Sequence, residues 1–367
     1  MWKPTRVATT TQTKIRTSRL GKAKGETQSL PFDKRHGKEL KMSVLIVTNK
    51  GDVTSDIVIE KLRSLGAKVF RLNTEDVCSL VSTSLQINSS LFKGQFKTQS
   101  RALDFSQISS VYYRRPLPPE LECDDPGVKE FVVTEITTYL NWLWHALTDV
   151  YWMSPLLSIR RADSKIGQLK IAPLFGLEIP DTIITNNPDD VRAFYQKHSG
   201  KIVNKVLAKG FVDINGETRT IYTNLVDFQM LDFVDTCKTV PCVFQEYIPK
   251  EVEIRATVVG KQVFAAEIHS QTSQRTRHDW RRYDLENTLH RPHELPVEVQ
   301  KACVGITKHY GLEFGAIDLI LTPEGKYIFL EINPNGQWAW IEVLTGLPIS
   351  DAIAKLLANP PHYNRGS

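Results

Sequence analysis

The chain has 367 residues, 41% hydrophobic and 24% charged, which is the composition of an ordinary globular protein of two or three domains. No apolar run approaches the roughly 20 residues of a membrane helix, and the N-terminus lacks a secretory apolar core, so we expect no membrane partner. The net charge of +5 is concentrated in residues 1–41, which hold 11 of the 46 Lys and Arg but 3 of the 41 Asp and Glu. The remaining 35 basic and 38 acidic residues leave the globular part mildly acidic, which argues against a nucleic-acid partner.

Residues 1–41 are rich in Thr, Lys, Arg and Gly and show no sustained apolar period. We expect this basic extension to be disordered or only locally ordered. Three interpretations stay open: an artefact of expression or of the assigned start, a disordered tail, or a fused peptide that acts in cis on the rest of the chain.

A sharp change of pattern begins at Met42. The run SVLIVTN at 43–49 predicts a buried strand, residues 56–65 have helical spacing, and AKVFRLN at 67–73 predicts a second strand. This β-α-β order indicates a small parallel α/β domain. Short strand-like pieces follow between residues 85 and 113.

The cysteines form an odd set without a CxxC pair: Cys78, Cys123, Cys237, Cys242 and Cys303. This usage favours reduced thiols in the cytoplasm over a disulfide framework or a zinc site.

The middle of the chain alternates helices and strands. We expect a long amphipathic helix over 127–149, a helix over 163–175 that ends near a glycine, and another over 189–200. KIVNKVLA at 201–208 predicts a strand, and INGE at 214–217 predicts the turn of a hairpin.

The last third of the chain favours a mostly antiparallel sheet. Strand patterns occupy 242–248, 253–271 and the two arms of 314–337, while 297–309 and 348–358 have helical spacing.

The segment 314–337 carries the most informative side chains. It has the pattern of two apolar strands joined by a tight turn at 322–325. Asp318, Glu331 and Asn333 lie in it, and alternation along a strand points Glu331 and Asn333 the same way. Two carboxylates and an amide oxygen are hard ligands that suit Mg²⁺ and the phosphates it accompanies.

The pairing of the two arms decides whether these ligands meet. We expect Leu321 to pair with Lys326, as the turn suggests. Asp318 would then lie opposite Phe329, on the face that carries Glu331. A lone acid near a strand end is usually solvated, but Glu331 is embedded in apolar sequence, and burying an unpaired carboxylate is costly. A metal ion or another cation is therefore expected beside it.

Other charged residues gain meaning from their order. Lys165 begins a helix, Lys205 lies in an apolar strand, QEYI at 245–248 ends a strand, and Glu253 shares a strand face with Arg255. Each alone has an ordinary structural interpretation, such as an edge lysine or a surface ion pair. Together they supply the charge neutralisation and positioning that phosphoryl transfer needs. No Walker A loop and no GxGxxG motif is present, so neither a P-loop nor a Rossmann nucleotide site is expected.

This order of residues resembles the ATP-grasp carboxylate–amine ligase superfamily, nearest the branch of glutathione synthetase and the ribosomal-protein glutamate ligases. Within that branch, YYRRP at 112–116, AAEIHSQ at 265–271 and EINPNGQWAWIE at 331–342 resemble the microviridin-type (graspetide) peptide maturases. The resemblance covers about 42–357.

The resemblance implies a fold that combines α/β and α+β parts. It is an ATP-grasp fold with a small parallel α/β (pre-ATP-grasp) domain and a mainly antiparallel C-terminal ATP-binding region. The expected divisions are a basic extension at 1–41, the pre-ATP-grasp domain at 42–155, a central (lid) subdomain at 156–248, a C-terminal subdomain with the metal site at 249–360, and a tail at 361–367.

The resemblance also implies the contacts of ATP and of two Mg²⁺ ions. They are Lys165, Lys205 and Arg255 for the phosphates, the main chain of Glu246 and Ile248 for adenine with Gln245 and Tyr247 nearby, Glu253 for the ribose, and Asp318, Glu331 and Asn333 for the metal. One departure is visible, because VLAKGFVDING after Lys205 lacks the dense Gly/Ser loop of the superfamily. The position of the phosphate-covering loop is therefore open.

The implied substrate is a ribosomal precursor peptide with a leader and a core, and the implied assembly is a homodimer. An Asp or Glu side chain of the peptide would become an acyl phosphate, which a Thr, Ser or Lys side chain then displaces to close a ring. We place Arg281 at the acyl phosphate or at substrate carboxylates, and Asp279 and His269 as candidate bases. The stretch 273–284, which contains Asp279 and Arg281, is the expected acceptor-side element. The competing interpretation of this stretch is a solvated basic loop.

Two other functions remain open. An amino-acid (glutamate-type) ligase acting on a protein C-terminus or a small carboxylate would use the same nucleotide residues. Ring closure removes one water of about 18 Da, whereas ligation adds an amino-acid residue, so product mass separates the two. A non-catalytic nucleotide-binding regulator on the same fold is the third possibility.

Overall fold

The computed structural model describes residues 42–208, 210–272 and 288–361, all within one compact unit, Lys41–Ser367. The basic extension, Asp279 and Arg281 lie outside the described residues. None of the described helices is long and apolar enough to cross a membrane. All five cysteines are free thiols.

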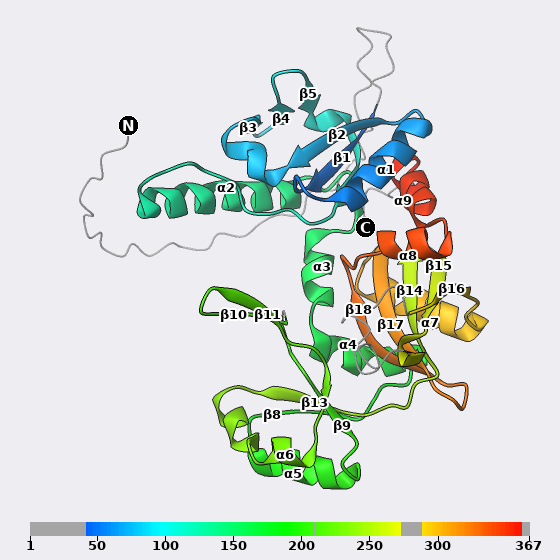
Figure 1. The fold of residues 1–367 in the computed structure, drawn as a ribbon. Coiled ribbons are helices and arrows are strands. Elements are labelled where there is room, and N and C mark those ends of the chain that lie inside the picture. Colours follow the sequence, from blue (N-terminus) through cyan, green and yellow to red (C-terminus); the bar gives the residue numbers. More distant parts are fainter. Residues whose placement is uncertain (1–41, 209, 273–287, 362–367) are drawn as a thin grey trace, which may run out of the picture. The chain divides into compact units, whose positions relative to one another are not determined.

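The first sheet is parallel, as the β-α-β pattern predicted. Its strands β1 (Ser43–Thr48), β2 (Lys68–Asn73), β6 (Ile108–Tyr113) and β7 (Tyr151–Met153) stand in the order β2-β1-β6-β7. Figure 1 labels β1 and β2 of this sheet beside α1. Every residue of β1 is buried, which explains its unbroken apolar run. Helix α1 (Val53–Ser64) makes the crossover between β1 and β2.

An antiparallel ribbon and a long helix complete the N-terminal part. The ribbon consists of β3 (Ser82–Asn88), β4 (Leu91–Lys97) and β5 (Ala102–Asp104). Helix α2 (Pro126–Ala146) begins at Asp125, whose side chain accepts hydrogen bonds from the N–H groups of Gly127 and Val128. Trp144 is buried in the core on this helix, whereas Trp142 is 71% exposed.

The central part is a second small antiparallel sheet with helices beside it. The strands β8 (Thr182–Thr185), β9 (Ile202–Lys205), β12 (Asn224–Leu225) and β13 (Cys242–Glu246) stand in the order β12-β9-β13-β8. The helices of this region are α3 (Leu156–Ala162), α4 (Lys165–Ile171), α5 (Pro188–Lys197) and α6 (Phe228–Leu231).

The hairpin that the sequence INGE predicted is present. It joins β10 (Phe211–Ile214) to β11 (Glu217–Thr220). Asn215 and Gly216 both have positive φ, 53° and 82°, as a two-residue turn of this kind requires.

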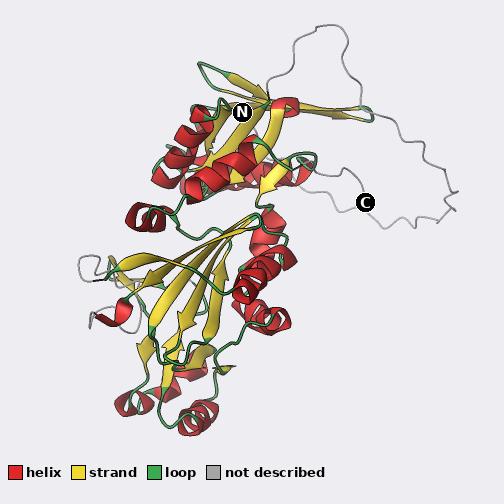
Figure 2. Cartoon of the chain, turned by 90° about the vertical axis from the view of Figure 1, so that its right-hand side faces the viewer, coloured by secondary structure: helices red, strands yellow, loops and turns green. Residues whose placement is uncertain are grey.

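The C-terminal sheet is antiparallel and, among the described residues, has five strands, β16 (His290–His293), β15 (Gln262–Ile268), β14 (Val252–Val259), β17 (Phe314–Leu321) and β18 (Tyr327–Asn333), in that spatial order. Figure 2 shows the sheet in yellow with helices along one side. Helix α7 (Val297–His309) contacts β14, β15 and β17 and covers the apolar residues of a shared core.

The chain ends with α8 (Ala339–Thr345) and α9 (Ile349–Ala358), and α9 packs against α1 of the first sheet. Trp338, which is fully buried, donates from Nε1 to the hydroxyl of Tyr112 on β6 at 3.3 Å. One core cluster therefore includes residues from both the first and the last parts of the chain. Helix α8 was not expected from the sequence.

Candidate active site

Three neighbouring strands place charged side chains in one row. Arg255 on β14 is paired in register with Asp318 on β17, which is paired with Glu331 on β18. Cross-strand partners project from the same face of a sheet. Arg255 Nη1 donates to Asp318 Oδ1 at 2.8 Å, while Asn333 Nδ2 lies 3.3 Å from Asp318 Oδ2 and 3.2 Å from Glu331 Oε1. The two carboxylates and the amide predicted from strand alternation do converge.

The predicted register of the hairpin is wrong by one residue. Leu321 pairs with Tyr327 and not with Lys326. The carbonyl of Lys326 accepts instead from Thr322 N at 2.9 Å, and the turn closes with Gly325 N donating to Thr322 O, also at 2.9 Å. The turn itself was predicted correctly, but it takes up one more residue than the pairing assumed.

A β-bulge then restores the predicted convergence. The register shifts between Asp318 and Leu319, so that Leu319 pairs with Phe329 while Asp318 pairs with Glu331. Leu330 is the extra residue on β18. If the register did not shift here, Asp318 would face Leu330, and the two carboxylates would lie on opposite faces of the sheet. The bulge is thus the local device that assembles the acidic pair, and nothing in the sequence pattern indicated it.

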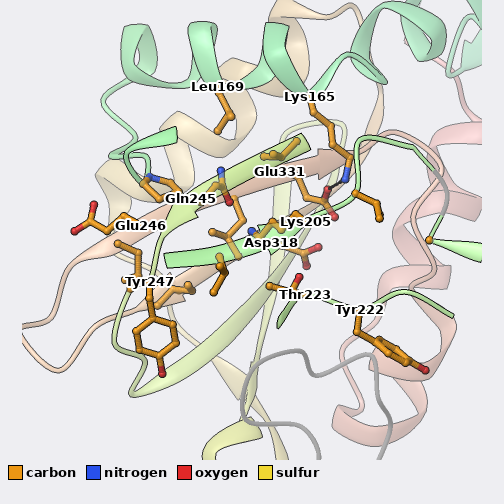
Figure 3. Close-up of a pocket in the computed structure, with 18 of the residues that line it drawn as sticks. Lys165, Leu169, Lys205, Tyr222, Thr223, Gln245, Glu246, Tyr247, Asp318 and Glu331 are labelled. Atoms are coloured by element: carbon orange, nitrogen blue, oxygen red, sulfur yellow. Dashed lines mark hydrogen bonds and ion pairs between the residues drawn. The ribbon is translucent and has the colours of Figure 1, made fainter. Parts of the chain in front are cut away.

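Helix α4 brings Lys165 to the acidic pair. Its N-terminus is capped by Ser164, whose Oγ accepts from Gly167 N at 3.2 Å. Lys165 Nζ lies 2.6 Å from Glu331 Oε2. One turn further on, the buried Gln168 binds the backbone of Ile332 with both ends of its amide. Figure 3 shows Lys165 reaching down from its helix toward Glu331.

A cavity of about 340 Å³ opens beside these residues. Its walls include apolar side chains such as Val203 and Leu319, and Lys205 projects into it from β9. Figure 3 shows Gln245, Glu246 and Tyr247 on one side of this space and Lys165 with Glu331 on another. The sequence-predicted residues that line it are Lys165, Lys205, Gln245, Glu246, Tyr247, Ile248, Glu253, Asp318 and Glu331.

The segment after β13 is held by its own backbone bonds. Glu246 N donates to Asp181 O and Tyr247 N donates to Lys201 O, each at 2.9 Å. Gln245 is buried and donates from Nε2 to Thr182 Oγ1 at 3.0 Å, while its Oε1 has no partner among the described residues. A buried acceptor without a partner is costly, and here it borders a cavity that a polar ligand can enter.

The sequence argument missed several residues that line the cavity, among them Lys250, Tyr222 and Thr223. Lys250 is buried and forms an ion pair with Glu253, the residue expected to bind a ribose. Tyr222 and Thr223, which precede β12, also line the cavity. Lys250 directly follows Pro249 and stands three residues before Glu253, and that spacing was the one available signal. No sequence signal indicated Tyr222 and Thr223, because the strand that follows them, β12, is only two residues long.

Of the three residues predicted to act on the acceptor side, the structure describes only His269. His269 Nε2 lies 2.8 Å from Glu267 Oε2 and does not line the cavity. Glu267 Oε1 also lies 2.9 Å from Nδ1 of His293, whose Nε2 is 2.8 Å from the hydroxyl of Tyr327. Burial opposes ionisation of Glu267, but the bonds from His293 and His269 outweigh it and lower its pKa. Asp279 and Arg281 fall outside the described residues.

The donor set fits a magnesium ion. As metal ligands, Asp318, Glu331 and Asn333 would each supply an oxygen, and no group of three or more His, Cys, Asp or Glu with metal-site geometry occurs among the described residues. Mg²⁺ commonly takes one or two carboxylates and completes its shell with water and substrate phosphates. These residues fit the coordination preference of Mg²⁺ better than that of a closed structural zinc site.

Comparison with known families places this geometry. Residues 43–160 match the MvdD pre-ATP grasp domain, and residues 162–357 match the RimK-like ATP-grasp domain, which covers more than half of the chain. The chain belongs to the RimK-like ATP-grasp family. The resemblance inferred from the sequence, an ATP-grasp ligase of the graspetide type, is confirmed, and so is the mixed fold of a parallel pre-ATP-grasp sheet with antiparallel sheets.

Solved structures of this ATP-grasp group are similar over most of the chain. One is a RiPP-associated ATP-grasp ligase of Chryseobacterium gregarium in complex with ADP and a leader and core peptide. It is 31% identical, with a TM-score of 0.82 over 89% of this chain and 100% of that one. Another is the macrocyclase MdnC of Microcystis aeruginosa MRC bound with precursor peptide MdnA. It is 33% identical, with a TM-score of 0.76 over 87% and 100%.

A more distant relative is a probable alpha-L-glutamate ligase of Klebsiella pneumoniae (strain 342). It is 24% identical over 253 residues, which is 66% of this chain and 78% of that protein.

Proposed function

We propose that this ATP-grasp chain activates Asp or Glu side chains of a ribosomal precursor peptide and closes ester or amide rings with Thr, Ser or Lys side chains. The observation that carries the proposal is the Arg255–Asp318–Glu331 row, with Asn333 beside it, at the edge of a cavity that also holds Lys165 and Lys205. Two similar structures, at 31% and 33% identity, contain ADP with a leader and core peptide and a precursor peptide, respectively.

The proposed reaction has two steps. A carboxylate oxygen of the peptide bonds to the γ-phosphorus of ATP, and the bond to the ADP oxygen breaks. The hydroxyl or amine of the acceptor side chain then bonds to the acyl carbon, phosphate leaves, and the acceptor proton passes to a base. In this proposal Lys165, Lys205 and Arg255 would balance the phosphate charge, which is the principal demand of phosphoryl transfer.

We assign the base-binding segment to 245–248. The N–H groups of Glu246 and Tyr247 are already used by Asp181 and Lys201, so the Glu246 carbonyl and the Ile248 N–H are the main-chain groups proposed to bind adenine. Glu253 would leave Lys250 to meet the ribose, with Lys250 close to the same hydroxyls. Adenine would then lie against the apolar wall of the cavity.

Asp318, Glu331 and Asn333 would hold magnesium, and we retain two ions as the proposed number. The metal would supply charge neutralisation between phosphate oxygens. Because Lys165 Nζ already contacts Glu331 Oε2 at 2.6 Å, this lysine is close enough to contact the same phosphates.

Mass spectrometry of a co-expressed peptide tests the proposal. A short precursor with repeated Thr and Glu or Asp, encoded beside this gene, should lose about 18 Da for each ring formed. Gain of an amino-acid mass on the peptide or on a protein would favour the glutamate-ligase alternative, which the Klebsiella pneumoniae relative supports. ATP consumption that needs no carboxylate substrate would contradict both.

A homodimer is proposed with α2 as its contact surface. Val128, Phe131 and Trp142 on this helix are 49%, 65% and 71% exposed, and spacings of three and eleven residues put them on one side. Changing Phe131 and Trp142 together to Ser should convert the dimer to a monomer in sedimentation experiments. An unchanged mass would place the interface elsewhere.

The cytoplasmic location, the domain boundaries given above and the roles of Asp279, Arg281 and His269 stay proposals. His269 does not line the cavity, and its Nε2 contacts Glu267, so its role as an acceptor base needs the peptide to reach it outside that space.

A further inference from the structure

None of the roles proposed above for the ATP site uses the motif YYRRP at 112–116. Strand β6 ends at Tyr113, so Arg114 and Arg115 stand at the carboxyl end of a parallel strand. Ligands of open parallel sheets bind outside this end. The position therefore raises the question of what two consecutive arginines do there.

Arg114 is a buried cation held by neutral acceptors. It is 1% exposed, and its Nη1 donates to Asn335 O at 2.5 Å while its Nη2 donates to Gln337 Oε1 at 2.9 Å. No carboxylate among the described residues lies within ion-pair distance of Arg114, and its Nε has no partner there. Burying a charge in this way is costly. The positive charge is thus kept beside the turn of residues 333–336, here called the Asn335 turn, without a balancing acid among the described residues.

Arg115 reaches the same turn from the surface. Its Nη2 lies 3.3 Å from Asn335 O, so both arginines converge on one carbonyl. Its own carbonyl accepts from Asn49 Nδ2 at 2.6 Å, which fixes its backbone to the loop that follows β1. Arg115 is exposed, whereas Arg114 is buried.

The Asn335 turn directly follows the metal-type ligands. Gly336 N donates to Asn333 O at 3.1 Å, and a Cβ on Gly336 would lie 2.4 Å from Cβ of Ala316, so only glycine fits against β17. Two residues span at most about 7 Å, which puts Asn335 close to Asn333. The arginines therefore stand at the metal end of the site, on a different strand end from the 245–248 segment.

The reaction needs a cation at this place. In phosphoryl transfer the attacking and leaving oxygens lie roughly in line through the γ-phosphorus. A carboxylate that attacks must approach from the side away from ADP, and a second anion beside the phosphates requires charge compensation. An arginine offers paired donors whose geometry matches a carboxylate.

We propose that Arg115 binds the donor carboxylate of the peptide, and that Arg114 is a positioning residue that fixes Arg115 and the turn after Asn333. The ligand class is a side-chain carboxylate of Asp or Glu in an otherwise uncharged stretch of peptide. The proposal rests on the function proposed above, since it needs a carboxylate as the phosphoryl acceptor.

The test measures carboxylate-dependent ADP release by the full-length chain, first with the co-encoded precursor peptide and then with free L-glutamate. Arg115→Gln should raise the peptide KM tenfold or more and leave the ATP KM within twofold, whereas Arg115→Lys should recover part of the loss. Arg63→Gln removes the same charge from an exposed site on α1 and should change neither constant.

A second measurement separates binding from a structural effect. The parent should bind the peptide more tightly than a peptide with its donor Glu or Asp changed to the amide, and Arg115→Gln should lose this discrimination. Arg114→Lys, or Gln337→Leu if that variant folds poorly, should raise the peptide KM in the same direction with the circular dichroism spectrum unchanged.

The outcomes distinguish the two proposals. Ring formation by the parent with an unchanged peptide KM and full acid-over-amide discrimination in Arg115→Gln overturns the carboxylate site and leaves the proposed function standing. Glutamate-dependent ADP release without rings, lost in Arg115→Gln, overturns ring formation and supports the site. No ADP release with either carboxylate overturns both.

Discussion

Gln168 on α4 holds Ile332 on β18 by both ends of its side-chain amide. Its Oε1 accepts from Ile332 N at 2.9 Å and its Nε2 donates to Ile332 O at 2.8 Å, with a second bond from Nε2 to Ala162 O at 2.6 Å. β18 is the edge of its sheet, so Gln168 replaces the strand that would otherwise pair with it. The helix that carries Lys165 is thereby locked to the strand that carries Glu331.

Replacing Gln168 with Leu should destabilise the fold by about 2–4 kcal/mol, because buried N–H and C=O groups of Ile332 lose their partners. Urea unfolding measures this change. The Mg²⁺ concentration for half-maximal activity should also rise, since Lys165 and Glu331 lose their fixed separation. Gln196→Leu on the exposed side of α5 is the control and should stay within about 0.5 kcal/mol of the parent. Equal effects of the two changes would show that the bonds from Gln168 to Ile332 do not stabilise the fold.

Replacing Glu331 with Gln should abolish magnesium-dependent ADP release, by a factor of about 100 or more, because one of two carboxylates is lost. Steady-state kinetics over a Mg²⁺ titration gives the value. Glu324→Gln makes the same change at the exposed turn of the same hairpin and should behave as the parent. Retained activity in Glu331→Gln would show that the metal is held elsewhere.

Replacing Lys205 with Met should weaken nucleotide binding about 10-fold to 100-fold, since a cation in the cavity is replaced by an apolar chain of similar length. Calorimetric titration with ADP measures the affinity. Lys201→Met changes an exposed lysine just before the same strand. This control has the same net charge as Lys205→Met and should bind ADP as the parent does. Parallel losses in both variants would indicate a general charge effect and not a phosphate contact.

Glu267 should contribute a pH-dependent part of the stability. Its folded pKa lies below the usual value of about 4.3, so its contribution is complete above that pH and is lost as the pH falls through the folded value. Glu267→Gln should be about 1–2 kcal/mol less stable at pH 7 and should show a flatter stability profile below pH 5. Urea midpoints from pH 3.5 to 7 provide the comparison, with exposed Glu294→Gln as the control. A stability profile of Glu267→Gln that runs parallel to that of the parent would contradict the lowered pKa of Glu267.

The sequence predicted what depends on local pattern. The β-α-β opening, the hairpin at 214–217 and the helices at 297–309 and 348–358 follow from periodicity and glycine placement, and each is present. Alternation likewise placed Glu331 and Asn333 on one face, where they meet Asp318. The resemblance supplied the family, which the domain matches confirm.

What the sequence did not predict depends on tertiary contact. The turn at 322–325 takes up one residue more than the predicted pairing assumed, so the predicted register was one residue out. The bulge at Leu330, which brings Asp318 back opposite Glu331, has no signature in an apolar strand. Gln168 has the pattern of an ordinary helical residue until Ile332 is known to lie beside it. Lys250, similarly, is recognised as a site residue only from its ion pair with Glu253 and its place in the cavity wall.

The central claim is that the peptide carboxylate itself attacks the γ-phosphate. It is tested most directly by labelling the Asp and Glu carboxylates of the co-encoded peptide with ¹⁸O and measuring the released phosphate by mass spectrometry. The account predicts one ¹⁸O atom in each phosphate, together with one ring formed per phosphate. Ring formation that releases only unlabelled phosphate would contradict an acyl phosphate and the roles given to the site.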